Sequence, residues 1–362
     1  MNNAKIAVIG AGKTGRGFIG RLLAEAGEPV RYIDKNESLV NDMRDAGSFQ
    51  VHFFGGRRDD FTVDNFEITT WADTDLTGIE LILIAVGGTN LEDVGKELAQ
   101  RLPVDSEVRI ITCENASHPS ETVKNAIGRP NMPVSEATVF CTTIEADGLD
   151  IRSENYPKLQ CDAEALKGYI PSVKTITPVE GFGNFLTRKL FTYNAASCII
   201  AYLGWLKGYT SYGEAANDPE ILAKLDMNYA VTNRVLCKVF GYAEEDQAQF
   251  ALLSKEKFTN MEIVDTIERN AREPHRKLGA EERIIGPMKL IAAQGEDISV
   301  LVETAAAMLL YDSNKETKWK ELRKSHTDSQ LLAEISGLAE DDPLSRIIVE
   351  KSRSLLQEST YR

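Results

Sequence analysis

Residues 188–205 form a mostly apolar segment without proline that nevertheless contains a lysine, an asparagine and a serine, side chains that can exchange a proton with a reacting group or hydrogen-bond to it. Lysine is rarely buried unless it is paired or has a chemical task. At about 100° per residue in an α-helix, Asn194 lies about 140° around from Lys189, and Ser197 lies between them at about 80°. The spacing therefore predicts that these three side chains, with Tyr193, face one cavity. The alternative is a helix whose polar side chains reach water.

A glycine-rich turn near the N-terminus supplies a second chemical pattern. Residues 4–9 are typical of a buried parallel strand, and an amphipathic helix follows the turn. Gly10, Gly12 and Gly15 have the GxGxxG spacing, which permits a tight turn and lets a pyrophosphate approach the N–H groups at a helix N-terminus. The pattern predicts a dinucleotide site. A glycine-rich turn without a ligand is the alternative.

Asp34 ends a second predicted strand, residues 30–33, and follows the glycines at about the spacing of 20 residues expected for a ribose-binding carboxylate. A carboxylate at this position accepts hydrogen bonds from the adenosine ribose and repels a 2′-phosphate. We therefore expect NAD to be the cofactor rather than NADP. Lys35, next to Asp34, weakens that exclusion.

The chain divides into two parts by its periodicity. Its 362 residues exceed what one core comfortably fills. Strand and helix patterns alternate to about residue 183, and only helical periodicity follows. We predict an α/β protein with an N-terminal Rossmann-type doubly wound sheet in residues 1–183 and an all-α domain in residues 184–362. The expected strands are residues 4–9, 30–33, 66–69, 81–86, 107–112 and 138–145, with 51–54 in a flanking hairpin. The main expected helices of the second part are residues 184–206, 218–240, 243–254, 261–271, 280–294, 298–311, 315–325, 328–336 and 343–358.

Asn115 lies just beyond the strand predicted at residues 107–112. Ligands of open α/β sheets bind beyond the carboxyl ends of the strands, so we expect Asn115 near the substrate. Gly87 follows the strand at 81–86, where a cofactor passes close to the backbone. An Asx turn that only closes the strand is the alternative for Asn115.

The overall composition excludes several classes of protein. A net charge of −14 argues against general affinity for nucleic acid or anionic membranes. Five scattered cysteines without CxxC spacing, and four histidines, predict neither a disulfide framework nor a metal site. We find no apolar run of the roughly 18 residues that a membrane span needs, and no signal peptide. We expect a cytoplasmic protein.

A basic cluster stands out in this acidic chain, at Arg272, His275, Arg276, Lys277 and Arg283. Arginine forks match the geometry of phosphate and carboxylate. The cluster therefore predicts a clamp for an anionic part of the substrate, and a solvated basic loop is the alternative.

Together these motifs resemble the polyol-specific long-chain dehydrogenase/reductase family over nearly the whole chain. The resemblance implies a Rossmann domain, a helical C-terminal domain, NAD(H) and no metal. It rests on the following segments: Gly10 to Gly20, Ala85-Val86-Gly87, Cys113-Glu114-Asn115, Arg188 to Asn194, Ala201 to Gly204, and Arg272 to Leu278 with Arg283. The expected cofactor site comprises Gly10, Gly12, Gly15, Arg16, Gly17, Asp34, Val86 and Gly87.

The resemblance also implies roles for individual residues. Lys189 matches the family's catalytic acid/base, and Asn115 and Asn194 match the two asparagines that hold the reacting oxygen. Ser197 stands where the family has a histidine, and Glu145-Ala146 replaces an Asp-Arg pair. Serine cannot carry a proton as imidazole does, so we expect slower or differently selective catalysis, unless His118 fills part of the role.

The implied reaction interconverts a polyol phosphate and a ketose phosphate, with mannitol 1-phosphate and fructose 6-phosphate as the first expectation. A uronate or an unphosphorylated polyol is the alternative substrate. An NAD(H)-binding protein without catalysis is the alternative from another class. We expect a small-molecule substrate and a monomer or homodimer.

Overall fold

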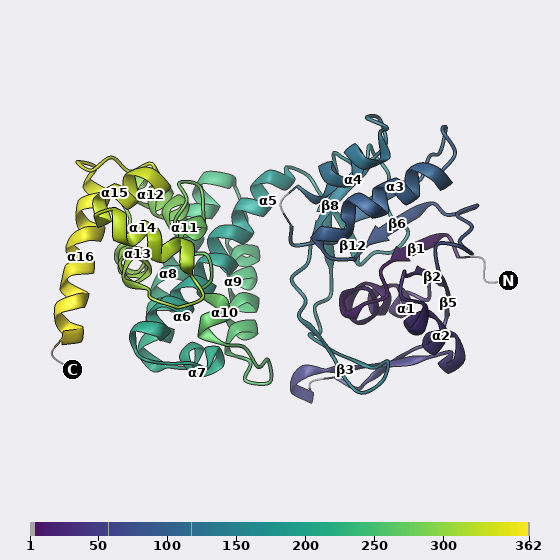
Figure 1. Cartoon of the computed structure of the whole chain (residues 1–362), viewed down its shortest axis with the longest axis horizontal. Coiled ribbons are helices and arrows are strands. Elements are labelled where there is room, and N and C mark those ends of the chain that lie inside the picture. The colour runs from purple at the N-terminus through teal and green to yellow at the C-terminus, as the bar shows by residue number, and fades with distance from the viewer. Residues whose placement is uncertain (1–3, 57, 117, 361–362) are drawn as a thin grey trace. The chain divides into compact units, whose positions relative to one another are not determined.

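The structure is a computed structural model that describes residues 4–56, 58–116 and 118–360. The chain folds into two compact units, Met1–Gly183 and Asn184–Arg362 (Figure 1). The division falls within the first turn of α5 (Phe182–Lys189).

The N-terminal unit contains an eight-stranded sheet in the order β12-β11-β8-β7-β6-β1-β2-β5. The six strands from β5 to β8 are parallel, and β11 joins β8 in the antiparallel direction. This is the strand order of a dinucleotide-binding doubly wound sheet, so the predicted fold class is confirmed. The strands are β1 (Ile6–Ile9), β2 (Val30–Ile33), β5 (Phe66–Thr69), β6 (Leu81–Ile84), β7 (Arg109–Thr112), β8 (Val134–Thr138), β11 (Leu159–Asp162) and β12 (Ile176–Val179).

Each face of this sheet has its own core because alternate strand residues point to opposite faces. Ile6 and Val8 pack with Phe18 on one face, whereas Ala7 and Ile9 pack with Leu91 on the other. The first face is covered by η1 (Gly15–Gly20), α1 (Arg21–Glu25) and α2 (Glu37–Ala46), and the second by α3 (Leu91–Arg101) and α4 (Pro119–Ile127) (Figure 1). Burial on both faces explains why the central strands are continuously apolar.

A second, four-stranded sheet corrects one sequence prediction. It has the order β4-β3-β10-β9, with β4 (Phe61–Val63), β3 (Phe49–Phe53), β10 (Ile151–Ser153) and β9 (Thr143–Glu145). The single strand predicted at residues 138–145 is therefore wrong, because β8 ends at Thr138 and β9 pairs in the other sheet. The buried link between them is held by side chains instead: Asn115 binds the Val139 carbonyl, and the Cys141 thiol binds the Glu154 carbonyl.

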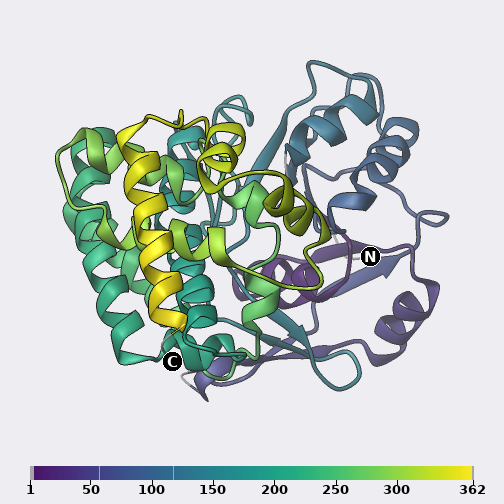
Figure 2. The same cartoon turned by 60° about the vertical axis from the view of Figure 1, so that its left-hand side comes forward.

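The C-terminal unit is helical and surrounds one apolar core. Figure 2 shows its last helix, α16, in yellow, and α16 packs lengthwise on α13. Within the described part of the chain, no helix combines the length and the apolar character needed to cross a bilayer. After α5 the helices are η4 (Leu190–Asn194), α6 (Ala195–Leu206), α7 (Tyr212–Ala216), α8 (Pro219–Phe240), α9 (Glu244–Thr259), α10 (Ile267–Asn270), α11 (Pro274–Lys277), α12 (Ile285–Ala293), α13 (Ser299–Leu310), α14 (Thr317–Ser325), α15 (Asp328–Ser336) and α16 (Pro343–Thr360).

The helix predicted at residues 261–271 is shorter than expected. Residues 261–263 form a turn, Thr266 then forms a β-bridge with Ser211, and the Thr266 hydroxyl caps α10 by accepting the Arg269 N–H. The pairing with Ser211 is non-local, and periodicity alone does not reveal it.

The core of the helical unit can be tested at Trp319, which is fully buried and donates its indole N–H to the Tyr311 carbonyl at 3.0 Å. We expect Trp319→Ala to cost about 3–5 kcal/mol, because truncating a large buried aromatic side chain leaves a cavity. Val104→Ala, at a side chain that is 89% exposed, should change stability by less than about 0.5 kcal/mol. Urea unfolding followed by circular dichroism measures both, and equal effects would contradict this assignment of the core.

Candidate active site

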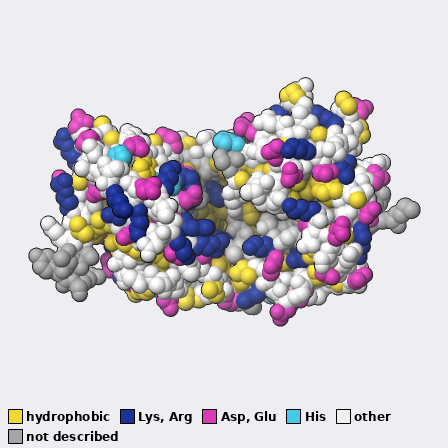
Figure 3. All heavy atoms as spheres, viewed as in Figure 1, with side chains coloured by type: hydrophobic (Ala, Val, Ile, Leu, Met, Phe, Trp, Pro, Cys, Tyr) yellow, Lys and Arg dark blue, Asp and Glu magenta, His cyan; other side chains and the backbone are white. Residues whose placement is uncertain are grey.

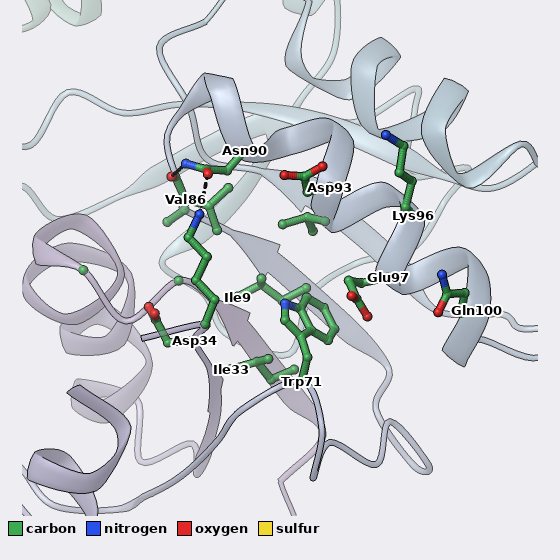
Figure 4. A pocket seen from close by; sticks show the side chains of 15 residues that line it. Ile9, Ile33, Asp34, Trp71, Val86, Asn90, Asp93, Lys96, Glu97 and Gln100 are labelled. Carbon is green, nitrogen blue, oxygen red and sulfur yellow. Dashed lines mark hydrogen bonds between the residues drawn. The ribbon is translucent and has the colours of Figure 1, made fainter. Parts of the chain in front are cut away.

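A cavity of about 530 Å³ opens at the carboxyl ends of the central strands of the N-terminal unit. Figure 4 shows Asp34 on one side of it and Asp93 and Glu97 of α3 on the other, with the Trp71 indole near Ile33. The sequence analysis did not single out Trp71, which follows β5 and presents an aromatic face to this cavity. Its lining is Ile9, Gly10, Gly12, Ile33, Asp34, Lys35, Trp71, Ala85, Val86, Asn90, Asp93, Val94, Lys96, Glu97 and Gln100.

The glycine turn beside this cavity is built to leave room for a ligand. Gly10 has φ +97°, and a Cβ there would lie 2.2 Å from the Ala85 carbonyl oxygen. A Cβ on Gly15 would lie 1.9 Å from the Gly10 carbonyl oxygen, whereas one on Gly12 would meet no atom within 4 Å. Gly10 and Gly15 are therefore required by the turn itself. Gly12 borders open space where a pyrophosphate fits.

Asp34 is held in place by backbone donors at the same edge of the sheet. Its Oδ2 accepts the Ala11 N–H at 2.7 Å, and its Oδ1 accepts the Asn36 N–H at 2.9 Å. Lys35 donates to the Asn90 side chain at 2.8 Å, and Asn90 in turn donates to the Val86 carbonyl at 2.7 Å. The loops after β1, β2 and β6 are thus tied together around the cavity, and their polar groups suit the ribose and pyrophosphate of a dinucleotide.

Four of the expected cofactor residues, Gly15, Arg16, Gly17 and Gly87, are not in this cavity lining, and Arg16 and Gly17 contact the second sheet instead. Arg16 is only 4% exposed, and its guanidinium lies 6.0 Å from the ring centre of Phe49. Its Nε and Nη1 have no hydrogen-bond partner within the described ranges, and burial lowers its pKa. A Cβ on Gly17 would lie 2.2 Å from Ile151, so Gly17 lets η1 approach β10 closely. These two residues of η1 therefore lie against the second sheet.

The loop after β7 contains Asn115 and a carboxylate that the sequence analysis did not single out. Asn115 is exposed, and its Nδ2 donates to the Val139 carbonyl at 3.1 Å. Glu114 accepts the Gly87 N–H at 2.6 Å, and burial raises the pKa of this carboxyl group. Glu114 therefore links the loops after β6 and β7. The position of Glu114 just beyond the carboxyl end of a buried strand is the sequence signal that could have identified it. His118 is 74% exposed and starts α4 with φ +46°.

The helix that contains Lys189 and Asn194 is not a continuous α-helix. The segment between them, η4, is a π-turn, and the Ala195 N–H donates to the Leu190 carbonyl five residues earlier. A turn closed by i→i+5 hydrogen bonds holds more residues than an α-helical turn, so side chains five apart lie closer together around the helix axis than in an α-helix. The predicted separation of about 140° between Lys189 and Asn194 therefore does not hold, because it assumed α-helical spacing. The π-turn brings these two side chains toward the same face of the helix.

The pKa of Lys189 is strongly perturbed. Its pKa is lowered to about 8, first because its ammonium is buried and then because Arg283 and Lys257 add positive charge nearby. The residue as a whole is half-buried, so its amine is shielded without being closed off. A substantial neutral fraction at neutral pH is what a general base requires.

Ser197 lies one turn further along, close to the buried hydroxyl of Tyr212 on α7. The two hydroxyls approach each other without the geometry of a regular hydrogen bond. Burial raises the pKa of Tyr212 and keeps its phenol neutral. The position that differs from the family pattern is therefore next to a second hydroxyl in the same unit.

The side chains of the basic cluster differ in how deeply they are buried and in which partners they bind. Lys277 is buried and donates to the Asn270 carbonyl at 2.5 Å, and Arg283 is largely buried beside Glu282 at 2.9 Å. Arg276 is half-exposed and forms ion pairs with Glu282 and Glu273. Arg272 is exposed, and burial together with the nearby Lys318 lowers the pKa of His275. Figure 3 shows lysine and arginine side chains gathered on one part of this unit's surface.

Arg283 connects the basic cluster to Lys189, because its charge is the largest electrostatic contribution to the lowered pKa of Lys189. An anion bound beside Arg283 would therefore also lie within the electrostatic range of Lys189. In the part of the chain that the structure describes, no group of three or more histidine, cysteine, aspartate or glutamate side chains is arranged to hold a metal ion.

Two glycine variants test whether the glycine turn serves a ligand. We expect Gly12→Ala to leave the melting temperature unchanged, since its Cβ points into open space, and to weaken NADH binding at least about tenfold by obstructing the turn. Gly15→Ala should lower the melting temperature, because overpacking of this kind costs about 1–3 kcal/mol. Calorimetric melting and NADH titration separate the two effects. Unchanged NADH affinity in Gly12→Ala would contradict the assignment.

Comparison with known proteins identifies the family of this chain. Residues 4–145 match the mannitol dehydrogenase Rossmann domain, and residues 182–354 match the mannitol dehydrogenase C-terminal domain. Mannitol-1-phosphate 5-dehydrogenase of Paenarthrobacter aurescens is 28% identical and covers 94% of this chain and 95% of that protein. The protein of the same name from Oceanobacillus iheyensis is also 28% identical and covers 96% of this chain and 97% of that protein.

Solved structures of similar fold cover nearly the whole chain. Mannitol 2-dehydrogenase of Pseudomonas fluorescens, in a ternary complex with NAD and D-mannitol, has a TM-score of 0.66 at 13% identity, covering 99% of this chain and 93% of that one. A substrate-free D-sorbitol dehydrogenase has a TM-score of 0.74 at 12% identity, covering 98% and 93%. The chain therefore belongs to the mannitol dehydrogenase family, a family of oxidoreductases that act on CH–OH groups.

Proposed function

We propose that this protein is an NAD-dependent dehydrogenase that interconverts a polyol phosphate and the corresponding ketose phosphate. The best candidates are mannitol 1-phosphate and fructose 6-phosphate. The observation that carries the proposal is the lowered pKa of Lys189 beside Asn194 at the π-turn, with Arg283 close by. The relatives named mannitol-1-phosphate 5-dehydrogenase support the same substrate class.

Cofactor binding in this proposal uses the cavity at the glycine turn. Gly10, Gly12 and Gly15 present the backbone to the pyrophosphate, and Asp34 accepts the ribose hydroxyls. Asp34 also repels the 2′-phosphate of NADP, although Lys35 moderates that repulsion. When bound, the nicotinamide accepts hydride from the polyol carbon or returns it to the ketose.

Proton transfer is the task assigned to Lys189. As polyol is oxidised, the neutral amine takes the hydroxyl proton, and in the reverse direction the ammonium returns a proton to the carbonyl oxygen. Asn194, which the π-turn brings closer to Lys189 around the helix axis, donates its amide N–H to the oxygen as negative charge develops. Asn115 is the second proposed donor. A donor of this kind typically contributes a factor of about 10²–10³ in turnover.

Substrate selection is assigned to the basic cluster. Arg283 and Lys277 are largely buried cations in an acidic protein, and such groups favour a phosphate over a neutral hydroxyl. A uronate carboxylate is the second candidate, because the same cations would also bind it and because Ser197 departs from the family pattern. At this position Ser197 offers the substrate a hydroxyl where the family has an imidazole, and the buried Tyr212 hydroxyl lies behind it.

The pH dependence of polyol oxidation tests the role of Lys189. Only the neutral amine accepts a proton, so below a pKa of about 8 the rate should fall about tenfold per pH unit and above it level off. The rate of ketose reduction should show the opposite pH dependence, level below this pKa and falling above it, because reduction needs the protonated ammonium of Lys189. Initial rates between pH 6 and 10 decide this, and a pH-independent oxidation rate would contradict the assignment.

Variants of Arg283 test the phosphate clamp. In Arg283→Gln we expect the KM for fructose 6-phosphate to rise by about tenfold or more, since a largely desolvated charged contact is lost, while turnover of fructose changes little. Loss of its charge should also raise the pKa of Lys189. Arg269→Gln, at an exposed arginine paired with Asp265, is the matched control. If the wild type prefers fructose or tagaturonate to fructose 6-phosphate, the proposed phosphorylated substrate is wrong and the preferred compound takes its place.

A further inference from the structure

A buried polar network joins α9 to both sides of Lys189. Gln247 is fully buried, and its Oε1 accepts the Arg188 Nε–H at 2.6 Å. Its Nε2 donates to the Thr192 hydroxyl at 3.2 Å and to Asn233 on α8 at 2.8 Å. Gln247 therefore contacts the residue directly before Lys189 and the middle of the π-turn that follows it.

Arg188 is fixed tightly enough to serve as one end of this network. It is 5% exposed, its Nη2 donates to the Asp246 carbonyl at 2.9 Å, and it also forms an ion pair with the Asp246 carboxylate at 2.7 Å. Its guanidinium carbon lies 4.3 Å from the ring centre of Phe250 and 4.5 Å from that of Tyr242. Since a buried guanidinium is costly unless its donors are bonded, the acceptor that Gln247 provides matters.

The π-turn also depends on tertiary contacts, because i→i+5 turns are rare inside helices that could close i→i+4 hydrogen bonds. Phe191 packs against Gly286 of α12, where an added Cβ would lie 2.9 Å from the Phe191 ring. The Tyr193 ring lies 5.0 Å from that of Phe250 on α9. Between these two aromatic residues, the Thr192 hydroxyl is held by Gln247.

We propose that Gln247 is a positioning residue that binds Arg188 and Thr192 at once, fixes the register of η4, and so directs Lys189 and Asn194 toward the same side of the helix. The inference rests on the proposed function for the chemical role of Lys189 and Asn194. The register of the turn is a separate property that can be measured without turnover.

Replacing Gln247 should release both segments that it binds. Arg188 loses an acceptor, and the Thr192 hydroxyl becomes available to bond a carbonyl of its own helix, as threonine does in ordinary α-helices. The turn then relaxes toward α-helical spacing, which moves the Lys189 amine toward water and away from Arg283 and Lys257. Since burial and these two charges lower its pKa, that pKa should rise.

The test measures the acidity of Lys189 directly in the full-length protein. Reductive methylation with ¹³C-formaldehyde labels the lysines, and the signal absent from Lys189→Arg identifies Lys189 in NMR spectra recorded against pH. We expect a pKa of about 8 in the wild type. In Gln247→Leu we expect a value about one unit or more higher, because the ammonium is better hydrated. The pH midpoint of polyol oxidation should move in the same direction, with an unchanged KM for NADH.

Ser254→Ala is the matched control, because Ser254 is also a fully buried polar residue of α9, but its hydroxyl bonds the Tyr229 hydroxyl of α8 at 2.8 Å instead of Arg188 and Thr192. It should lower the melting temperature without moving the pKa of Lys189. Gln247→Glu keeps an acceptor for Arg188 and lets the Thr192 hydroxyl donate, so it should retain more of the wild-type turnover than Gln247→Leu does, although its negative charge itself raises the pKa of Lys189.

An unchanged pKa of Lys189 in Gln247→Leu, or an equal shift in Ser254→Ala, would overturn the proposal. If Gln247→Leu does not fold, Thr192→Val removes the same contact from the other side and is expected to raise the pKa likewise. If the wild type turns over none of the substrates, the proposed function fails, while the NMR titration still decides the role of Gln247.

Discussion

The burial of one ammonium group, that of Lys189, is the constraint on which the active-site account depends. Taking a positive charge out of water is unfavourable, and Arg283 and Lys257 make it more so, which is why the pKa of this lysine falls to about 8. The cost is tolerated because the surrounding helices are locked by other contacts. Arg188, the preceding residue, is a second buried cation, and its guanidinium is bonded to Gln247 and Asp246.

In the N-terminal unit, side-chain hydrogen bonds fix several loops at one edge of the sheet. Asp34 binds the glycine turn, Lys35 reaches Asn90, and Glu114 binds Gly87. Each contact links loops that follow different parallel strands, so the edge acts as one preformed surface. Preformed polar groups suit a cofactor whose reactive end must be aligned, because little ordering is needed when it binds.

The features that could be predicted from the sequence are those that depend on short stretches of neighbouring residues. The strands at residues 30–33 and 66–69, the glycine turn and the carboxyl-end position of Asn115 follow from short patterns, and the structure has them there. The π-turn was missed because helical periodicity assumes 3.6 residues per turn, and one extra residue leaves no mark in composition.

Other features were missed because they depend on contacts between distant segments. The split of residues 138–145 between two sheets is fixed by Asn115 and Glu154, and the state of each basic residue is set by partners such as Glu282. The basic cluster itself was visible as a run of residue types. Which of its cations are buried, and that Arg283 acts on Lys189, required the fold.

The most direct measurement of the central claim is the transfer of deuterium from NADH carrying deuterium at the reactive C4 position to fructose 6-phosphate, followed by the mass of the product. The account predicts a polyol phosphate heavier by one deuterium, formed by the wild type at least about a hundredfold faster than by Lys189→Met, since loss of a general acid/base removes a factor of about 10²–10⁴. Deuterium transfer at equal rates in both proteins would contradict the role of Lys189. Binding of NADH without transfer to any ketose phosphate, ketose or uronate would contradict the account as a whole.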